Sequence, residues 1–205
     1  QFVRYWMHNG YITINGDKMS KSEGNFFTLR EILDQAPGEA VRFALLSGHY
    51  RSPLDWNPDN LKQAKASLDG LYTALRQVET IQPEPDTDLP DEFLNALDDD
   101  LNTPIAISHM HELARQLNKA ETDTEKARLK AKLLACGELL GVLSQSTDDW
   151  FRWQPKDADT VAEDDVAPHL DGPGPAGQRG RHRGATSLGR EQLAEGFAGA
   201  VVFQL

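Results

Sequence analysis

The clearest pattern along the chain is an apolar stripe between residues 61 and 78. Its members recur at alternating intervals of three and four residues: Leu61, Ala64, Leu68, Leu71, Leu75 and Val78. This spacing places them on one face of a helix of about five turns. Asn57-Pro58 stands directly before the stripe, as an amide cap followed by proline in the first turn. The pattern therefore predicts a long amphipathic helix that begins at residue 58.

Two further stripes follow a polar linker with three prolines, residues 82–90. Asp91 opens another helix, and Asn102-Thr103-Pro104 caps the next one. That helix carries Ile107, Met110, Ala114 and Leu117 on one face. The last predicted helix runs from about residue 124 to 144 and carries Leu129, Leu133, Cys136, Leu140 and Leu143. Four or five amphipathic helices with short connections predict an antiparallel bundle, so we expect a mainly α protein.

The first 48 residues mix helix and strand signals. Residues 1–9 fit a short helix that ends at Gly10, and residues 11–14 alternate as a strand before an Asn15-Gly16 hairpin turn. Thr28 and Glu31 have the spacing of a capping box, which predicts a helix to about Ala36. After Pro37-Gly38 we expect a second helix that ends near Gly48. Its predicted buried face consists of Val41, Ala44 and Leu45.

Composition narrows the class of protein. The chain has 205 residues, and 39% of them are hydrophobic, which is ordinary for a globular protein. No apolar run approaches the length of a membrane span, so we expect no membrane partner. The net charge is −11, which argues against unselective nucleic-acid binding. The acidic excess lies in residues 83–150, which contain fifteen acidic and six basic side chains. The single cysteine, Cys136, fits a reducing compartment.

The candidate chemistry lies in the run Lys18, Met19, Ser20, Lys21 and Ser22, between the predicted hairpin and the capped helix. Two lysines three residues apart on such a loop can bring ammonium groups onto a polyphosphate. There they would stabilise negative charge that develops on phosphate oxygens. A solvated surface loop explains five such residues equally well, so the flanking residues decide between the two interpretations.

Four runs in this order resemble the cysteinyl-tRNA synthetases, a family of class I aminoacyl-tRNA synthetases. They are residues 5–10 (YWMHNG), 18–25 (KMSKSEGN), 47–52 (SGHYRS) and 98–104 (DDDLNTP). The resemblance extends from about residue 1 to about residue 145. It implies that residues 1–35 are the end of a Rossmann-type catalytic domain with the lysine loop. Residues 36–82 would be a connecting helical segment and residues 91–150 an anticodon-binding bundle. From their composition, residues 151–205 are expected to form an irregular tail.

The resemblance also implies an activity. In the family, the carboxylate of L-cysteine attacks the α-phosphorus of ATP, and the acyl group then moves to the 3′ end of tRNA-Cys. Lys21 is the expected ATP contact, and Lys18 is expected to help hold the loop. The family's zinc site, made by two cysteines, a histidine and a glutamate, is not among these residues, so we expect no metal ligands here and the zinc upstream. We therefore expect this portion alone to be inactive, and the enzyme to be a cytoplasmic monomer.

Two other functions remain open. The first is a related ligase that joins cysteine to an amino-sugar inositol, although the well-patterned helices of residues 91–144 argue against it. The second is a non-catalytic tRNA-binding module, against which the retention of Lys18 and Lys21 argues. Synthetases for methionine or branched aliphatic residues share the loop, but residues 6–10 and 98–104 fit cysteine better.

Other polar and aromatic residues have competing explanations. His8 can be a ligand or a histidine at the end of a helix, and residues 49–51 can face tRNA or complement helix carbonyls. His109 and His111 are two apart on a helix, which makes a poor metal pair. Residues 98–100 are expected to interact with the dipole of the next helix. Phosphate contact and solvation explain the basic residues of the bundle equally well: Arg115, Lys119, Lys126, Arg128, Lys130 and Lys132. Stacking on bases and packing in the core are both open for the aromatic residues Tyr50, Trp56, Trp150 and Trp153.

The tail departs from the family's pattern. Residues 155–190 are rich in glycine and keep no helical or strand period, so we expect them to be disordered or loosely packed. Residues 170–173 and 190–197 resemble two pieces of the family's end in the wrong order. We hypothesise that a reading-frame error replaced the native end. Masses of peptides from natively expressed protein would contradict this hypothesis if they matched the tail.

Overall fold

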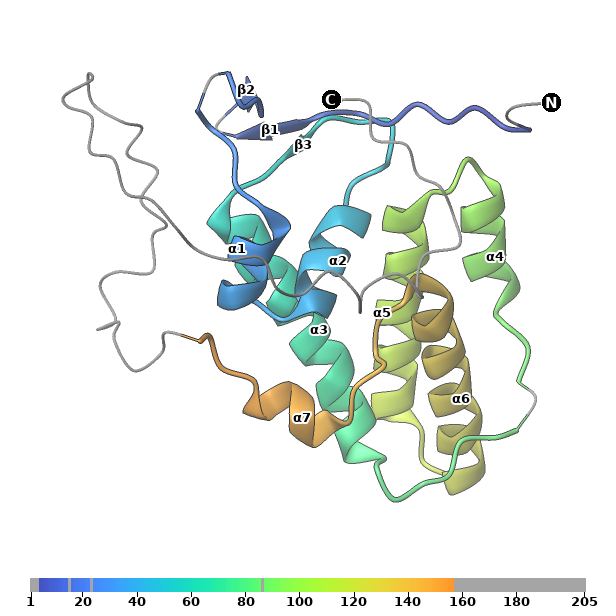
Figure 1. Cartoon of the computed structure of the whole chain (residues 1–205). Coiled ribbons are helices and arrows are strands. Elements are labelled where there is room, and N and C mark those ends of the chain that lie inside the picture. The colour runs from blue at the N-terminus through green and yellow to red at the C-terminus, as the bar shows by residue number, and fades with distance from the viewer. Residues whose placement is uncertain (1–3, 15, 23, 86, 157–205) are drawn as a thin grey trace.

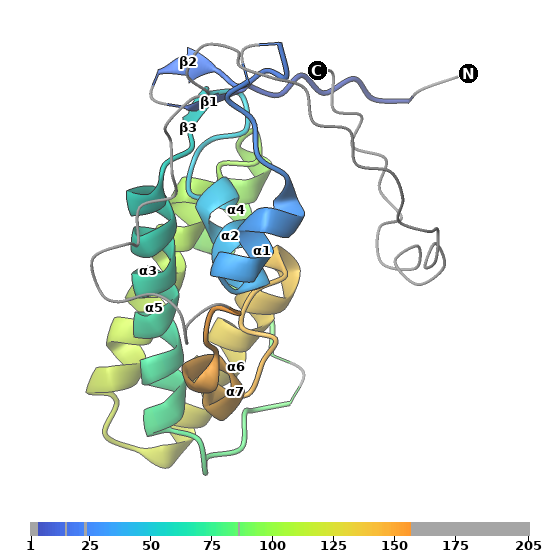
Figure 2. The same ribbon diagram turned by 60° about the vertical axis from the view of Figure 1, so that its left-hand side comes forward.

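A computed structural model describes residues 4–14, 16–22, 24–85 and 87–156. These residues form a mainly α structure with a small sheet at one end of a helical bundle, as Figures 1 and 2 show from two sides. The expected fold class is confirmed. The tail beyond residue 156, with its expected disorder and the frame hypothesis, lies outside the described residues. No described helix has the length and apolar character needed to cross a membrane.

The sheet has three short strands in the order β2-β1-β3. The predicted hairpin is confirmed: β1 (Ile12–Ile14) pairs with β2 (Asp17–Lys18) antiparallel, and Gly16 in the turn has a φ of +87°. The pattern did not reveal β3 (Leu54–Asp55), which pairs with β1 in parallel, with Ile12 opposite Leu54. Two residues are too few to produce a periodic signal.

The helix predicted for residues 1–9 is wrong where the chain is described, because residues 4–10 are not helical. Gly10 lies instead against the chain that leads into β3, where its N–H donates to the Tyr50 carbonyl at 2.7 Å. A Cβ atom at this position would lie 2.2 Å from the Ser52 carbonyl oxygen. The glycine therefore allows two backbone segments to approach each other and does not cap a helix.

Two short helices lie between the β1–β2 hairpin and β3. Thr28 and Glu31 form the predicted capping box at the start of α1 (Leu29–Gln35). The helix α2 (Gly38–Leu46) buries Val41 and Ala44 as expected, but Leu45 is 43% exposed and Phe43 is buried in its place. Phe43 contributes to the core with Ala40 and Ala44, at the i, i+3, i+4 spacing of one helix face.

The bundle is built around α3 (Pro58–Gln77), which packs against α2, α5 and α7. Its predicted stripe lies in the core, with Leu61 half-buried at the edge. The remaining helices are α4 (Asp91–Asp98), α5 (Thr103–Lys119), α6 (Asp123–Leu140) and α7 (Thr147–Arg152). The helix α5 also packs against α4 and α6, so one continuous core joins the two ends of the bundle.

The predicted end of α6 is wrong by four residues. Gly141 adopts a left-handed conformation (φ +68°) and stops the helix, and the Val142 N–H donates to the Gly137 carbonyl at 2.8 Å. Leu143 is nevertheless buried, with a φ of +60°. It continues the apolar stripe without continuing the helix. The short α7, which was not predicted, follows this turn and buries Trp150.

The turn after α6 is held by a buried carboxylate on α2. Glu39 is 8% exposed and accepts hydrogen bonds from Leu143 N (2.9 Å), Ser144 N (3.0 Å) and Ser144 Oγ (2.6 Å). The Tyr72 hydroxyl on α3 donates to the same carboxylate at 2.7 Å. Backbone donors thus satisfy a buried charge, and three separate segments meet at one side chain.

Candidate functional site

The lysine loop, residues 18–25, begins at the end of the β1–β2 hairpin, which hydrogen bonds hold in place. The Met19 N–H donates to the Ile12 carbonyl at 2.9 Å, so the chain leaves the sheet at Lys18. Asp55 of β3 accepts from Thr13 Oγ1 (2.9 Å) and from Gly16 N (3.1 Å), which fixes the hairpin turn. The Gly16 N–H, with Asn57 and Thr13, lowers the pKa of Asp55 below its usual range. Sequence patterns gave no role to Asp55, because β3 was not predicted.

Asn25 closes the loop. Its Oδ1 accepts from the Ser20 N–H at 2.9 Å, and its Nδ2 donates to the Lys18 carbonyl at 3.2 Å. The Gly24 N–H donates to the Lys21 carbonyl at 3.3 Å, and Gly24 has a φ of +70°, which favours glycine. The Asn25 side chain therefore connects the end of the loop to two backbone groups at its start, those of Lys18 and Ser20. Asn25 belongs to the motif of residues 18–25, but the sequence alone predicted no role for its side chain.

The two lysines present their ammonium groups at the surface. Lys18 Nζ lies 5.9 Å from the centroid of the Tyr11 ring, and Lys21 Nζ lies 5.9 Å from that of Phe26. Neither lysine has an ion pair with the described residues. An exposed cation–π contact is worth only about 0.5–1 kcal/mol, so either ammonium group can move to an anion at little cost. The arrangement suits the binding of a polyphosphate.

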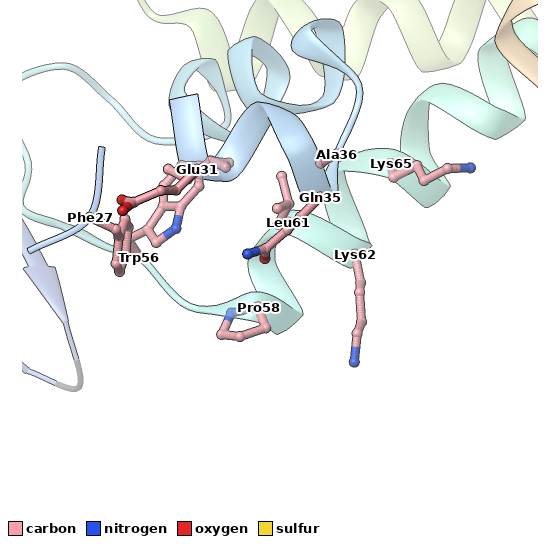
Figure 3. Close-up of a pocket in the computed structure, with 10 residues that line it drawn as sticks. Phe27, Glu31, Gln35, Ala36, Trp56, Pro58, Leu61, Lys62 and Lys65 are labelled. Carbon is pink, nitrogen blue, oxygen red and sulfur yellow. The ribbon is translucent and has the colours of Figure 1, made fainter. Parts of the chain in front are cut away.

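Beyond the loop, the chain lines an apolar groove between α1 and α3. Figure 3 shows Phe27 and Trp56 together at one end of the groove. Their ring centroids are 6.2 Å apart. The groove has a volume of about 190 Å³. Trp56 is 8% exposed, so this ring is a wall of the groove and part of the core, and it is not free to stack on a base.

Four polar side chains connect the motif of residues 47–52 with that of residues 98–104. We call them the Asp100 ring: His49, Tyr50, Arg51 and Asp100. Asp100 accepts from the Tyr50 hydroxyl (2.7 Å) and from Arg51 (2.9 Å), and His49 lies 3.9 Å away. Arg51 Nε also donates to the Tyr50 oxygen at 2.7 Å. The Tyr50 hydrogen bond, with the charge of Arg51, lowers the pKa of Asp100. Asp100 therefore has specific partners, beyond the helix-dipole interaction expected for residues 98–100.

The backbone at this ring has an uncommon conformation. Asp100 and Leu101 have φ values of 57° and 54°, in the left-handed region that non-glycine residues rarely adopt. The following Asn102 caps α5, where its side chain accepts from the Ile105 N–H. The acidic residues before Asn102 thus belong to a tight turn between α4 and α5. No periodic pattern could have identified it.

Two of the other aromatic and basic candidates, Trp150 and Lys130, have structural roles. Trp150 is 1% exposed, stacks on Tyr72 with centroids 4.6 Å apart, and donates from Nε1 to Asp69 at 2.7 Å. Lys130 donates to the carbonyls of Val78, Glu79 and Ile81, so it fixes the turn after α3. Arg115 pairs with Glu112 on its own helix. Lys119 and Arg128 remain exposed on the bundle.

The described residues do not fit a zinc site. No group of three or more His, Cys, Asp or Glu side chains among them could hold a metal ion. Cys136 is fully buried on the apolar face of α6, and burial raises the pKa of its thiol to about 12. His111 is half-buried with its ring edge-on to Phe43. We derive no step through zinc from these residues.

Known proteins match both ends of this architecture. Residues 1–66 match the catalytic domain of class I (C) tRNA synthetases, and residues 92–144 match the DALR domain. The class is thus that of the class I aminoacyl-tRNA synthetases.

Three curated proteins, each named cysteine–tRNA ligase, are similar over most of this chain. That of Paramagnetospirillum magneticum is 59% identical over 152 residues, which cover 74% of this chain and 33% of the relative. That of Rhodospirillum rubrum is 51% identical (73% and 32%), and that of Caulobacter vibrioides is 47% identical (76% and 34%). The chain belongs to the cysteine–tRNA ligase family, and it spans about a third of the length of these relatives.

Proposed function

We propose that this chain is part of a cysteine–tRNA ligase that activates L-cysteine with ATP and transfers it to tRNA-Cys. The observation that supports this most directly is the lysine loop. Its two lysines have exposed ammonium groups and no ion pair with the described residues. Asn25 bonds to Ser20 and Lys18, and Lys21 lies exposed in the loop between Ser20 and Asn25. The family membership of the chain supports the choice of amino acid.

In the first step, a carboxylate oxygen of cysteine attacks the α-phosphorus of ATP, and pyrophosphate leaves with the electron pair of the broken P–O bond. Negative charge grows on the leaving phosphates, and Lys21 binds them and stabilises this charge. The other residues of the loop that binds ATP are Lys18, Met19, Ser20 and Ser22. In the second step, a terminal hydroxyl of tRNA attacks the cysteinyl carbonyl and AMP leaves. Lys18, whose carbonyl is bonded to Asn25, holds the loop in register.

The activity is testable in a chimera, because the chain spans a third of its relatives. In the Paramagnetospirillum magneticum enzyme, the matching 152 residues are replaced by those of this chain. We expect ATP–pyrophosphate exchange with cysteine, and we expect Lys21→Ala to lower its kcat by about 10²–10³, as when one group that stabilises transition-state charge is lost. Lys62→Ala on α3 is the matched control, since Lys62 is also an exposed lysine.

Equal rates for Lys21→Ala and Lys62→Ala would contradict the role of Lys21. Cysteine activation without transfer to tRNA, but with transfer to an amino-sugar inositol, would favour the related ligase. Absence of both reactions with intact tRNA binding would favour a non-catalytic module.

We also propose that the helices matched by the DALR domain bind tRNA-Cys as an anticodon reader, in a cytoplasmic monomer. The exposed basic side chains of these helices, such as Lys119 and Arg128, would form a local positive patch on an otherwise acidic surface. Fluorescence anisotropy of this chain with tRNA-Cys and with other tRNAs, over a salt series, tests the proposal. Selective binding that weakens steeply with salt is expected. Equal and weak binding to all tRNAs would contradict it.

A further inference from the structure

A pocket between α2, α3 and α5 has no role in the proposed function. It has a volume of about 360 Å³, within the range of sites that bind small molecules. Its lining shares no residue with the lysine loop or with the groove between α1 and α3. The helix α3 packs against both α2 and α5, which Figures 1 and 2 show on either side of it. The pocket therefore lies on elements that form the core of the bundle.

Part of the lining is apolar and held in place by the fold. Phe43 and Ile107 are 2% and 7% exposed and belong to the buried core. Leu54 of β3 packs on the backbone at Gly48, since a Cβ atom there would lie 3.2 Å from Leu54 Cδ1. The pocket therefore offers an apolar surface to a ligand without rearrangement of these side chains.

The polar part of the lining has hydrogen-bonding capacity that the described residues leave unused. The side chains of Gln63, Ser67 and His111 make no hydrogen bond to another described residue. Gln63 has two amide donors and a carbonyl acceptor, and Ser67 has a hydroxyl group. Burial lowers the pKa of His111 below its usual range. The ring is therefore neutral at pH 7.5, with one nitrogen that donates and one that accepts.

These groups restrict the chemistry of a ligand. No Asp, Glu, Lys or Arg lines the pocket, so a phosphate, carboxylate or ammonium group would be buried there without an opposite charge. A purely apolar molecule would cover Gln63, Ser67 and His111 and leave their polar atoms unsatisfied. A nucleobase meets both requirements. It is neutral, its faces pack on apolar and aromatic side chains, and its edge carries donors and acceptors.

We propose that this pocket binds a neutral nucleobase, with a face of the base against Leu54 and Ile107 and its polar edge bonded to Gln63, Ser67 and His111. The base belongs either to a free nucleoside or to an unpaired nucleotide of an RNA. The site goes beyond the proposed function, because it includes neither the lysine loop nor the exposed basic side chains of the bundle. Only the RNA source rests on the proposed binding of tRNA.

Nuclear magnetic resonance of the methyl groups of Leu54 and Ile107 in the full chain tests the proposal. The probes are adenosine, guanosine, cytidine and uridine, which are neutral. We expect at least one of them to shift these resonances in a saturable way. Gln63→Ala should weaken its binding about tenfold, as for the loss of one bidentate contact to a base edge. Gln77→Ala, at an exposed position of the same helix outside the pocket, is the matched control and should not.

A substitution that fills the pocket gives a second measurement. Ser67→Phe should abolish the nucleoside shifts, whereas Ala66→Phe, at the neighbouring exposed position outside the lining, should keep them. Circular dichroism shows whether both variants are folded. If Ser67→Phe does not fold, the comparison of Gln63→Ala with Gln77→Ala still decides.

Two RNA hairpins of equal length distinguish the sources of the base. Stronger binding of a hairpin with one unpaired base than of any nucleoside, with the same methyl shifts, would assign the site to RNA. Shifts with nucleosides alone would assign it to a free nucleoside. Equal shifts with a fully paired hairpin would overturn the proposal, and so would an equal effect of Gln63→Ala and Gln77→Ala. Absence of shifts with every probe, while the chain still binds tRNA-Cys selectively, would overturn the pocket and leave the proposed function intact.

Discussion

At the scale of single residues, Cys136 shows how burial determines reactivity. Its side chain is fully buried, and the pKa of its thiol is raised to about 12. At pH 8, about one thiol in ten thousand would be ionised, and the thiolate is the reactive form. We predict that a disulfide reagent will label native protein very slowly and will label it at once in urea. Rapid labelling of the native chain would show that α6 opens readily.

His111 gives the chain a pH dependence on the acid side. Burial, with a smaller effect from the charge of Arg115, lowers its pKa below the ordinary value of 6.5. The unfolded chain therefore takes up a proton first as the pH falls. The contribution of His111 to stability is complete above pH 6.5 and is lost progressively below it.

We predict that His111→Gln will reduce the fall in the free energy of unfolding between pH 7 and pH 5.5. Urea titrations at several pH values measure it. His109→Gln, two residues away on α5, is the matched control substitution. The same slope in both variants would mean that His111 does not titrate on unfolding.

At the scale of elements, two helical glycines have opposite roles. A Cβ atom at Gly70 in α3 would have no atom within 4 Å, whereas one at Gly137 in α6 would lie 2.8 Å from the Val142 carbonyl oxygen. We predict that Gly70→Ala stabilises the protein by about 0.5–1 kcal/mol, since alanine loses less entropy in a helix. Gly137→Ala should destabilise it, because the turn that ends α6 must shift. Thermal unfolding measures both, and stabilisation by both would contradict the close packing of this turn.

The helices with long periodic stripes could be predicted from the sequence, and the short elements could not. The stripes of α3 and α5 and the caps at Thr28, Asn57 and Asn102 were correct because each is a local signal. The strand β3 and the turn at Asp100 depend on partners about 40 to 50 residues away. Gly10, in the non-helical run of residues 4–10, likewise bonds to a partner 40 residues away, the Tyr50 carbonyl.

The candidate site shows the same division. The lysines could be found as a motif, because their chemistry depends on residue type and spacing. The residues that position them could not, because Asn25 and Asp55 act through hydrogen bonds that only the folded chain displays. The tryptophans were ambiguous for a similar reason, since a large aromatic side chain suits both a core and an interface.

At the scale of the whole molecule, the two regions matched by different domain models share one core. Phe43 of α2, Leu68 of α3 and Leu133 of α6 belong to the same buried cluster. The Asp100 ring and the hydrogen bond from Thr103 Oγ1 to the Leu46 carbonyl (2.7 Å) join them at the sheet end. The helices that follow the lysine loop thus pack into the same core as the bundle.

Glu39 also connects the two regions, because its carboxylate on α2 accepts from Leu143 N and Ser144 N beyond α6. Glu39→Gln keeps one acceptor oxygen but turns an amide donor toward groups that are themselves donors: Leu143 N, Ser144 and the Tyr72 hydroxyl. Loss of a charge-assisted hydrogen bond together with an unsatisfied buried donor should cost about 3 kcal/mol. Urea unfolding followed by tryptophan fluorescence measures this, because Trp150 stacks on Tyr72.

Glu138→Gln, on the exposed side of α6, is the matched control and should change stability by less than about 0.5 kcal/mol. Fluorescence and far-ultraviolet circular dichroism should still give one shared transition in Glu39→Gln if the core holds the halves together without the carboxylate. Two separate transitions would show that the carboxylate, more than the apolar core, joins α2 to the bundle, since only a cooperative unit melts as one.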